Sequence, residues 1–467
     1  MLKKLPAFFV LLFFAIFSQS ALSSDSQGPS LIRDAETEKF LRQLARPIFL
    51  AADLNPQNIS IYIINDNSLN AFVSGGQNVF INTGLIRKYN TPNTLIGVIA
   101  HESGHIAAGH LARSSEGSQE AQGAMLLSYL LGIGAALGGS PDVGMALLMG
   151  GNDTANRLFM KYTRGQEEAA DNHAIEYLGK MQYPADGLIT LLDSFQSEMI
   201  GYQGQIDEYL LSHPVSKKRI DLIRSRTQGV HFSDKKINKD LQPQMDRVLA
   251  KLEGFMENPD EILRKYQNQN DEFSNYKKSI AFFRKGEITK SIKLLDDVIE
   301  KNSAITIKSK YDSPELGFLY ELKGQILFES GHIVESTITY DKALKLLAPQ
   351  DSSQAKIAFV GSILALPQTD KDLVNLAIKR LDEAEKYESE NPYLYKQLAT
   401  AYSKINDEGR SMLALAKFNC MIGQKEKCAK YAKQAQEKLD KSAKAELVQV
   451  DDLLEDEKEE NKKKGKK

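Results

Sequence analysis

The sequence predicts an α+β fold that is mostly helical, with a small antiparallel sheet in its N-terminal domain and an all-α domain after it. Two observations predict this arrangement. Residues 59–82 form short runs of alternating apolar and polar residues, which are typical of half-buried strands. After residue 90 the apolar residues follow a helical period, and residues 272–440 partly repeat one helical pattern. A chain of 467 residues has room for two or three domains.

The N-terminus has the order of regions of a cleavable signal peptide, which we place at residues 1–23. Lys3 and Lys4 precede an apolar run over residues 5–17, and small residues follow it. The run is shorter than the roughly 20 residues that span a bilayer, although an uncleaved anchor is the alternative. We therefore expect export, which in a bacterium means the periplasm.

Charge is nearly balanced along the whole chain, with 59 basic and 61 acidic residues and a net charge of -2. This balance gives no overall basic field that would attract nucleic acid. No nucleic-acid partner is therefore expected.

The predicted strands lie within residues 59–82, where the glycine pair Gly75-Gly76 forms one turn. A helix follows over residues 95–112, with Asn93 or Thr94 as its N-cap. The alternation of side chains and the later helical period thus predict a sheet followed directly by a long helix.

Residues 123–151 are apolar and rich in glycine, with Pro141 between their two halves. Each half is too short to cross a membrane alone. We expect a helical hairpin that packs on the core, lies over a cleft or makes peripheral contact with a lipid surface.

A further helical run covers residues 156–181, and Pro259 marks the approach to a domain boundary. We assign residues 24–265 to the first domain and residues 266–445 to the all-α domain. Residues 446–467 are an acidic block followed by a basic one, and they are expected to be solvated and disordered.

The all-α domain repeats one spacing of small and apolar residues, with offsets of 3, 4, 5, 4 and 3. These are the offsets of a tetratricopeptide repeat, in which small residues let two antiparallel helices approach each other. A weaker copy begins with Phe282, Gly286 and Ser291, so the array is irregular, and an unrelated helical bundle is the alternative. Three sets follow the spacing: Gly324, Leu327, Gly331, Ser336, Tyr340 and Ala343; Ala399, Tyr402, Asn406, Ser411, Leu415 and Phe418; and Ala416, Asn419, Gly423, Cys428, Ala432 and Ala435.

Cys420 and Cys428 are the two cysteines of the chain, and they flank a turn-like segment. In an oxidising compartment they can close a disulfide between two antiparallel helices. Two buried free thiols are the alternative. Two cysteines alone do not make a complete zinc site.

The segment HESGH at residues 101–105 has the spacing of a catalytic zinc site. Residues four apart on a helix are only about 40° out of register, so His101 and His105 can hold one metal ion together. Glu102 is turned by about 100° from His101, so its carboxylate can reach a water at the metal without binding the metal itself. Two histidines are not enough, and a third ligand is required.

The segment TRGQEEAAD at residues 163–171 offers that third ligand. Glu167 and Asp171 are four apart and share a face, so one can bind zinc while the other hydrogen-bonds a ligand histidine. Glu168 is the nearest competitor to Glu167, but it lies three residues from Asp171 rather than four.

Two further histidines do not share the ligand faces. His173 lies about 240° around its helix from Glu167, and His110 lies about 140° from His105. Both are interpreted as surface or satisfied polar residues.

These motifs together resemble the HtpX-like and CAAX-prenyl-protease-like branch of the gluzincin metallopeptidases. The segments NAFVSGG and HPVSKKR match that branch as well, and Thr163 is a mild departure, since the family often has Ser there. The resemblance implies a zincin-type metallopeptidase domain that binds one Zn2+ per chain. The resemblance depends on two motifs together. The first is HESGH, and the second is R-x-x-E-x-x-A-D, formed by Arg164, Glu167, Ala170 and Asp171.

By this resemblance His101, His105 and Glu167 are the zinc ligands, Glu102 is the general base, and Asp171 supports a ligand from behind. With a signal peptide before it and repeats after it, the domain is similar to periplasmic zinc metalloendopeptidases of Gram-negative bacteria. The implied function is quality control of exported proteins, in which misfolded or stalled outer-membrane β-barrel proteins are degraded or helped to assemble. The repeats would then recruit these clients or their assembly machinery.

In the relatives the segment HPVSKKR lies near the zinc, so His213 and Arg219 are candidates for a role there. The two side chains can stabilise the tetrahedral oxyanion, or the imidazole can occupy the open fourth position of zinc and hold the enzyme latent. The latch is favoured because a protease among unfolded clients needs restraint. A structural histidine that only packs in the cleft is the third possibility.

The segment NAFVS is the candidate substrate strand. It lies between two other apolar strands in sequence, so it can form a sheet edge at which Asn70, Ala71 and Phe72 pair with an extended peptide. Backbone pairing tolerates many side chains, which predicts a preference for unfolded clients rather than for a sharp motif. An ordinary interior strand is the alternative.

Two other functions compete with proteolysis. A periplasmic chaperone or scaffold would act mainly through its repeats and keep a latent protease site. A structural zinc site would need no general base, so the presence of Glu102 argues against it.

Overall fold

The computed structural model describes residues 30–74, 77–110, 153–200, 213, 215–229, 232, 235–303 and 314–464. The chain divides into two compact units, Met1–Glu257 and Asn258–Lys467. The predicted signal peptide, the Gly75-Gly76 turn and the apolar hairpin at 123–151 lie outside the described residues. Among the helices in the described ranges, none combines the length and the apolar character needed to span a bilayer.

The first unit is built on a four-stranded sheet with the order β1-β2-β4-β3. The sheet is mixed rather than antiparallel as predicted, because β2 and β4 run parallel while the two outer pairs are antiparallel. Alternation cannot tell which neighbour a strand will pair with. Here β4, whose Val79 and Ile81 are fully buried, lies inside the sheet, and β3, which ends at the exposed Ser74, lies at the edge. The strands are β1 (Ser30–Ile32), β2 (Ile61–Asn65), β3 (Ala71–Ser74) and β4 (Asn78–Asn82).

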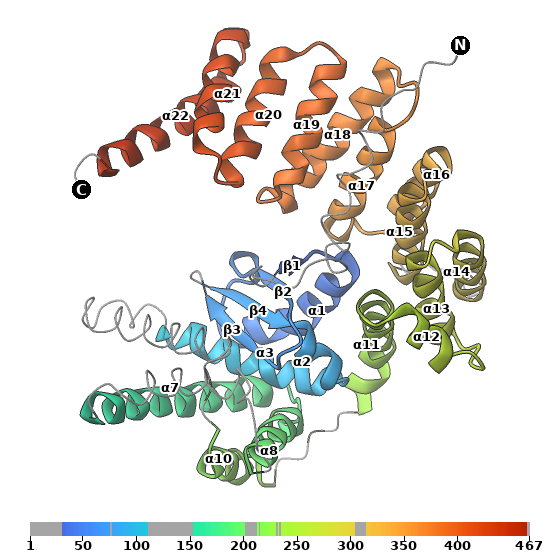
Figure 1. Cartoon of the computed structure of the whole chain (residues 1–467). Helices are drawn as coiled ribbons and strands as arrows, with labels where there is room; N and C mark the ends of the chain where they lie inside the picture. Colours follow the sequence, from blue (N-terminus) through green and yellow to red (C-terminus); the bar gives the residue numbers. More distant parts are fainter. Residues whose placement is uncertain are drawn as a thin grey trace. The chain divides into compact units, whose positions relative to one another are not determined.

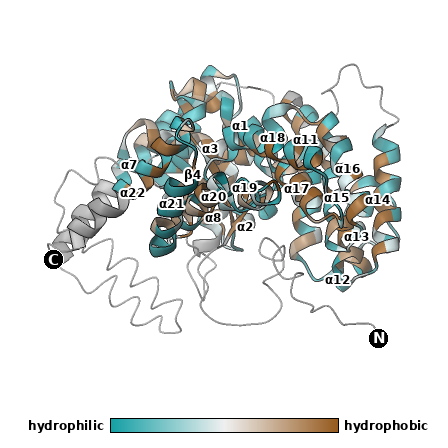
Figure 2. Ribbon diagram, turned by 90° about the horizontal axis from the view of Figure 1, so that it is seen from above, coloured by the Kyte–Doolittle hydropathy of each residue, from teal (hydrophilic) through white to brown (hydrophobic). Residues whose placement is uncertain are grey.

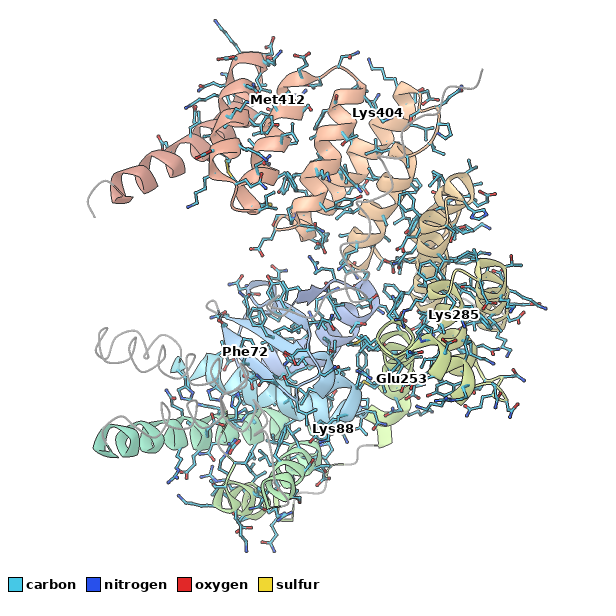
Figure 3. All side chains as sticks on the ribbon, in the orientation of Figure 1. Phe72, Lys88, Glu253, Lys285, Lys404 and Met412 are labelled. Carbon is cyan, nitrogen blue, oxygen red and sulfur yellow. A yellow bond between two sulfur atoms is a disulfide. The ribbon has the colours of Figure 1, made fainter. Side chains whose placement is uncertain are left out.

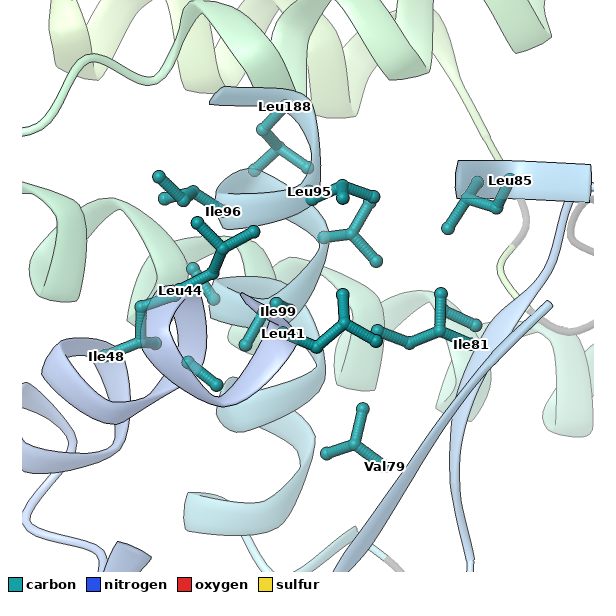
Figure 4. Close-up of a cluster of buried hydrophobic side chains, with 14 of the residues drawn as sticks. Leu41, Leu44, Ile48, Val79, Ile81, Leu85, Leu95, Ile96, Ile99 and Leu188 are labelled. Carbon is teal, nitrogen blue, oxygen red and sulfur yellow. The ribbon is translucent and has the colours of Figure 1, made fainter. Parts of the chain in front are cut away.

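Two helices cover one face of this sheet, α1 (Ala35–Ala51) and α3 (Pro92–Ala107). Figure 4 shows Val79 and Ile81 of β4 beside leucine and isoleucine side chains of these helices. The strand residues that alternate with the buried ones face away from the helices, as the period of two requires. The remaining helices of this unit are α2 (Thr83–Lys88), α7 (Asp153–Lys180), α8 (Asp186–Ile200), α10 (Lys217–Thr227) and α11 (Lys235–Met256) (Figure 1).

Helix α3 begins earlier and ends sooner than predicted. Thr91 is its N-cap, since its side chain accepts a hydrogen bond from Thr94 N, and Pro92 follows at the first helical position. Asn93 and Thr94, the predicted caps, are therefore inside the first turn. The helix ends at Ala107, and Gly109 turns the chain with a φ of 64°.

The second unit is all-helical in its described part, and several of its helices carry hydrophobic and hydrophilic residues along the same ribbon (Figure 2). The helical hairpins predicted from the repeat offsets are present. The third position of every set, and Gly286 of the weaker copy, has positive φ: 76° at Gly286, 82° at Gly331, 61° at Asn406 and 74° at Gly423. The helices are α12 (Pro259–Lys265), α13 (Glu272–Arg284), α14 (Ile288–Ser303), α15 (Pro314–Glu329), α16 (Ile333–Leu346), α17 (Ser353–Leu364), α18 (Lys371–Glu388), α19 (Pro392–Lys404), α20 (Glu408–Met421), α21 (Lys425–Lys438) and α22 (Lys444–Lys464).

Equivalent serines join the two helices of these hairpins. Ser336 Oγ donates to Gly324 O at 2.8 Å, and Ser411 Oγ donates to Ala399 O at 2.9 Å. A methyl group on Gly324 would lie 2.8 Å from the ring of Tyr340, so the small residue at this position sets the helix spacing. The same contact recurring at the same offset supports a repeat rather than an unrelated bundle.

The structure of the second unit differs from the prediction in two features, its first residue and its C-terminal segment. Its first helix, α12, places the boundary at residues 257 and 258 instead of 265 and 266. The predicted disordered tail instead begins as helix α22, because Val450 and Leu454 recur four apart and are buried against α20 and α21. Of the two states left open for the cysteines, the structure contains the disulfide between Cys420 and Cys428.

A buried group of charges joins the first and last helices of the first unit. Arg247 Nε of α11 lies 2.7 Å from Glu36 Oε1 of α1, and Lys251 contacts Asp34 at the start of α1. All four side chains are at most 10% exposed. Burial raises the pKa of Asp34, but the charge and hydrogen bond of Lys251 outweigh it and lower that pKa below its usual value. Each charge is therefore tolerated because its partner is present.

We predict that Lys251→Met lowers the free energy of unfolding by about 3–5 kcal/mol, because it leaves the Asp34 carboxylate buried without its cation. Urea unfolding followed by circular dichroism measures the change, with Lys180→Met, at an exposed ion pair, as the control that should behave like wild type. Since the folded pKa of Asp34 is lowered, its contribution is present above about pH 4 and is lost on further acidification. A difference between variant and wild type that does not shrink below that pH would contradict this assignment.

Candidate metal centre

The site is built where helices α3 and α7 cross at two small residues. A methyl group on Gly104 would lie 2.7 Å from Ala170 O and 2.9 Å from Ala170 Cα, so only glycine permits this approach. Gly104 lies within HESGH and Ala170 within the R-x-x-E-x-x-A-D pattern. The close crossing brings Glu167 of α7 against the two histidines of α3.

Four side chains bring one donor atom each to a single point: His101, His105, Glu167 and His213. These atoms all lie within 4.8 Å of one another. His101 Nε2 is 3.2 Å from His105 Nε2 and 3.3 Å from Glu167 Oε2, and His105 Nε2 is 3.3 Å from Glu167 Oε1. His213 Nδ1 is 3.3 Å from His101 Nε2 and 3.2 Å from both Glu167 oxygens.

These spacings fit zinc. Ligand atoms about 2.0–2.1 Å from a tetrahedral zinc ion lie about 3.3–3.4 Å from each other, which follows from the geometry of a tetrahedron. The family resemblance implied three ligands, His101, His105 and Glu167, and the structure brings all three together. It also brings His213 to a distance that suits a fourth ligand.

A buried arginine and a buried aspartate contact the candidate ligands on the side away from the donor cluster. Asp171 Oδ1 lies 3.0 Å from His101 Nδ1, the nitrogen that faces away from the other ligands. Arg219 of α10 binds Asp171 through Nε at 2.7 Å and Nη2 at 2.9 Å, and it reaches Glu167 Oε2 through Nη1 at 2.9 Å. The guanidinium is thus engaged by carboxylates, which favours a supporting role over the stabilisation of an oxyanion.

The charges around the site favour a cation. Burial lowers the pKa of His101, but hydrogen bonds and charges from Asp171 and Glu167 outweigh it and raise that pKa to about 10. Burial raises the pKa of Glu167, but its electrostatic interaction with His213 and hydrogen bonds from the histidines bring that pKa well below its usual value. Burial lowers the pKa of His105 to about 3.

Glu102 lies beside the donors but outside their cluster. Its side chain is fully buried, burial raises its pKa, and its Oε1 makes no hydrogen bond within the described part of the chain. His213 Nε2 lies 3.5 Å from this oxygen. Glu102 therefore has the place and the free acceptor that a general base requires.

His110 has a contact that the helical-wheel argument missed. Its Nδ1 lies 2.9 Å from Nδ1 of His105, the nitrogen opposite the donor atom. The prediction placed His110 on another face of a continuing helix, but α3 ends at Ala107 and the turn at Gly109 brings the ring back. The signal available in the sequence was the glycine just before His110.

The other predicted residues lie outside the donor cluster. Glu168 binds Lys218 Nζ at 2.8 Å, so it is not a ligand in this arrangement, and His173 is partly exposed beside Tyr177. Asn70, Ala71 and Phe72 lie in or next to β3, which is at an edge of the described sheet and in contact with α3.

Comparison with known proteins agrees with this geometry. Residues 32–227, which hold the whole cluster, match the model of peptidase family M48. This stretch is an M48 peptidase domain. The gluzincin resemblance and the zinc ion that it implied are thereby confirmed for this domain.

The M48 domain is similar to several proteins named as proteases. It is 28% identical over 196 residues to the beta-barrel assembly-enhancing protease of Escherichia coli, and this alignment covers 42% of this chain and 40% of that protein. It is 27% identical over 202 residues to the putative beta-barrel assembly-enhancing protease of Vibrio cholerae, with the same coverage. The metalloprotease YcaL of Escherichia coli is 26% identical over 212 residues, which are 45% of this chain and 78% of that protein. The match thus spans about two fifths of the length of the first two relatives.

We predict that His101→Ala, His105→Ala and Glu167→Ala each abolish zinc binding, because each removes a donor from the site. Glu168→Ala is the matched control, since its carboxylate is adjacent in sequence but pairs with Lys218. Zinc per chain, measured by mass spectrometry of the purified protein, checks the ligand set. Full loading of Glu167→Ala together with loss in Glu168→Ala would overturn it.

Proposed function

We propose that this protein is a periplasmic zinc metalloendopeptidase that degrades unfolded or stalled exported proteins. The observation that supports it best is the convergence of His101, His105 and Glu167, with the buried carboxylate of Glu102 beside them. The names of the relatives point to outer-membrane β-barrel proteins as clients, and the repeats of the second unit are the proposed surface for those clients or their assembly machinery. The predicted signal peptide supports the periplasm as its location.

The residues divide the work of peptide hydrolysis. Zinc, when bound, polarises the scissile carbonyl and makes a nearby water more acidic. Glu102 takes the proton of that water and later delivers it to the leaving amine. Arg219 and Asp171 hold the ligand side chains in place, so that the site does not reorganise during the reaction.

His213 is the proposed latch of this enzyme. Its side chain is 7% exposed. It approaches two of the proposed zinc ligands, His101 and Glu167, through Nδ1, and it approaches Glu102 through Nε2. In this position it competes with a water or a substrate carbonyl for the place beside Glu102. Withdrawal of His213 would open both the fourth position and the general base together.

The competing function is a chaperone or scaffold that acts mainly through the second unit. The Glu102 carboxylate and the fit to zinc favour an enzyme, since binding of clients needs neither. A latched site is compatible with a protease and with a chaperone or scaffold. The effect of His213→Ala on proteolysis distinguishes these two functions.

Strand β3 is the proposed site at which clients bind. Asn82 N donates to Asn70 O at 2.9 Å, which fixes the phase of the antiparallel β3–β4 pair. In an antiparallel pair, every second residue directs both its N–H and its C=O to the partner strand. The N–H and C=O groups of Asn70 and Phe72 therefore face β4. The backbone groups of Ala71 and Val73 then face the edge, where an extended client can pair with them.

The activity itself is tested with an unfolded outer-membrane β-barrel protein and mass-spectrometric detection of its fragments. We expect His213→Ala to cleave several-fold faster than wild type, and Glu102→Gln to remove cleavage in either background while zinc stays bound. His173→Ala, at a partly exposed histidine of the same domain, is the control that should match wild type. A fall of about a hundredfold in His213→Ala with zinc bound would make His213 a transition-state donor instead of a latch.

The edge strand is tested by Val73→Pro, because proline removes the N–H that faces outward and leaves the β3–β4 hydrogen bonds intact. We expect cleavage to fall about three- to tenfold, the value of one lost hydrogen bond. Val73→Thr keeps the N–H and should cleave like wild type. Unchanged cleavage by a zinc-loaded Val73→Pro protein would rule out pairing at this edge. Asn70→Pro is less informative, because that backbone faces β4.

A further inference from the structure

We infer that Phe72 makes the proposed protease select client segments with an aromatic or β-branched side chain at one fixed position. The inference rests on the proposed pairing of clients with β3. It adds a side-chain preference to an interaction that otherwise depends only on the backbone.

Three aromatic rings form a row across the sheet. Tyr62, Phe80 and Phe72 are directly opposite one another on β2, β4 and β3. Tyr62 and Phe80 have ring centroids 5.1 Å apart with planes at 23°, and Phe72 and Phe80 have centroids 5.1 Å apart with planes at 12°. All three rings are half-buried, whereas the residues on either side of Tyr62 and of Phe80 are buried in the core on the opposite face of the sheet. On β3, Ala71 is buried on that face and Val73 is partly buried. We call Tyr62, Phe80 and Phe72 the aromatic row.

The aromatic row ends at the edge of the sheet. In the sheet that the structure describes, β3 is the last strand beside β4, and Figure 3 labels Phe72 on it. One side of the Phe72 ring stacks on Phe80, and a strand added to β3 would place a side chain on the other side. An added strand therefore extends the row by one member.

The hydrogen-bond phase makes this new contact a close one. The backbone of Phe72 faces β4, so the client residue opposite Phe72 in an antiparallel strand belongs to a non-hydrogen-bonded pair. Such pairs bring their Cα atoms to about 4.5 Å, closer than the about 5.5 Å of hydrogen-bonded pairs. Side chains on this position of the client meet the ring more closely than any others.

The composition of β3 supports a binding edge. Natural sheets protect exposed edges with charged residues, proline or very short strands. The segment from Asn70 to Ser74 has neither a charge nor a proline, whereas the opposite edge strand, β1, has three residues and is followed by Arg33 and Asp34. The two edges thus differ in the direction expected if β3 alone receives a strand.

The occupant with matching chemistry is an unfolded segment of a β-strand protein. Aromatic and β-branched residues are enriched in strands, and they pair favourably across strands with an aromatic ring. In an alternating segment, one residue lies opposite Phe72 and its neighbours two positions away lie on the same face. The expected selectivity is on the order of two- to fivefold, the range of a single cross-strand pair.

The test is a cleavage profile. A mixture of unfolded proteins is digested by the full chain and by His213→Ala, and the products are sequenced by mass spectrometry. We expect aromatic and β-branched residues to be enriched about two- to fivefold at one fixed distance from the cut. Phe72→Leu should lose most of this enrichment with its zinc content unchanged, and Phe72→Tyr should keep it.

Leu31→Ala is the matched control, since Leu31 is 49% exposed on the same face but at the opposite edge. Its profile should equal that of the unsubstituted chain. A profile with no enrichment at any position, or an enrichment that survives in Phe72→Leu, would overturn the inference while proteolysis itself stands. Absence of any Glu102-dependent product would instead reject the proposed function. The two failures are therefore distinguishable.

Discussion

The approach of helix α3 to helix α7 is the contact on which the whole metal centre depends. It is set by Gly104 and Ala170, whose small size lets the backbones of the two helices meet. His101 and His105 lie on either side of Gly104 in sequence, and Glu167 lies one turn before Ala170. A larger residue at Gly104 would push the two helices apart and separate the carboxylate from the histidines, even though every proposed ligand would still be present in the sequence.

Around this crossing, one arginine joins the parts of the site that come from separate segments. Arg219 belongs to α10, yet it binds Asp171 and Glu167 of α7, and Asp171 in turn contacts His101 of α3. Arg219 lies only six positions after His213 in the sequence. The guanidinium thus anchors the chain shortly after the residue proposed as the latch.

The ligand set and the helical repeats could be predicted from the sequence because both depend on short, regular spacings. His101 and His105, with Glu102 beside them, follow from positions on a helix, whereas the choice of Glu167 over Asp171 came from the family resemblance. The turn positions Gly331, Asn406 and Gly423 follow from one set of offsets. The strand pairing could not be predicted, because alternation fixes which face a residue occupies and not which strand lies next to it. The contact of His110 with His105 was not predicted, because the turn at Gly109 ends helix α3 earlier than the helical pattern suggests. Helix α22 was not predicted, because only two apolar residues among many charged ones, Val450 and Leu454, pack it against its neighbours.

The pairing of α1 with α11 has a consequence for when the first unit can fold during synthesis. Asp34 and Glu36 stand at the start of the peptidase unit, and their partners Arg247 and Lys251 stand near its end. The unit therefore lacks the counter-charges of its first helix until more than two hundred further residues have emerged. Until α11 has been made, the buried carboxylates of Asp34 and Glu36 have no cationic partner from that helix. The order of synthesis thus favours folding of the first unit as a whole, after its last helix has been made.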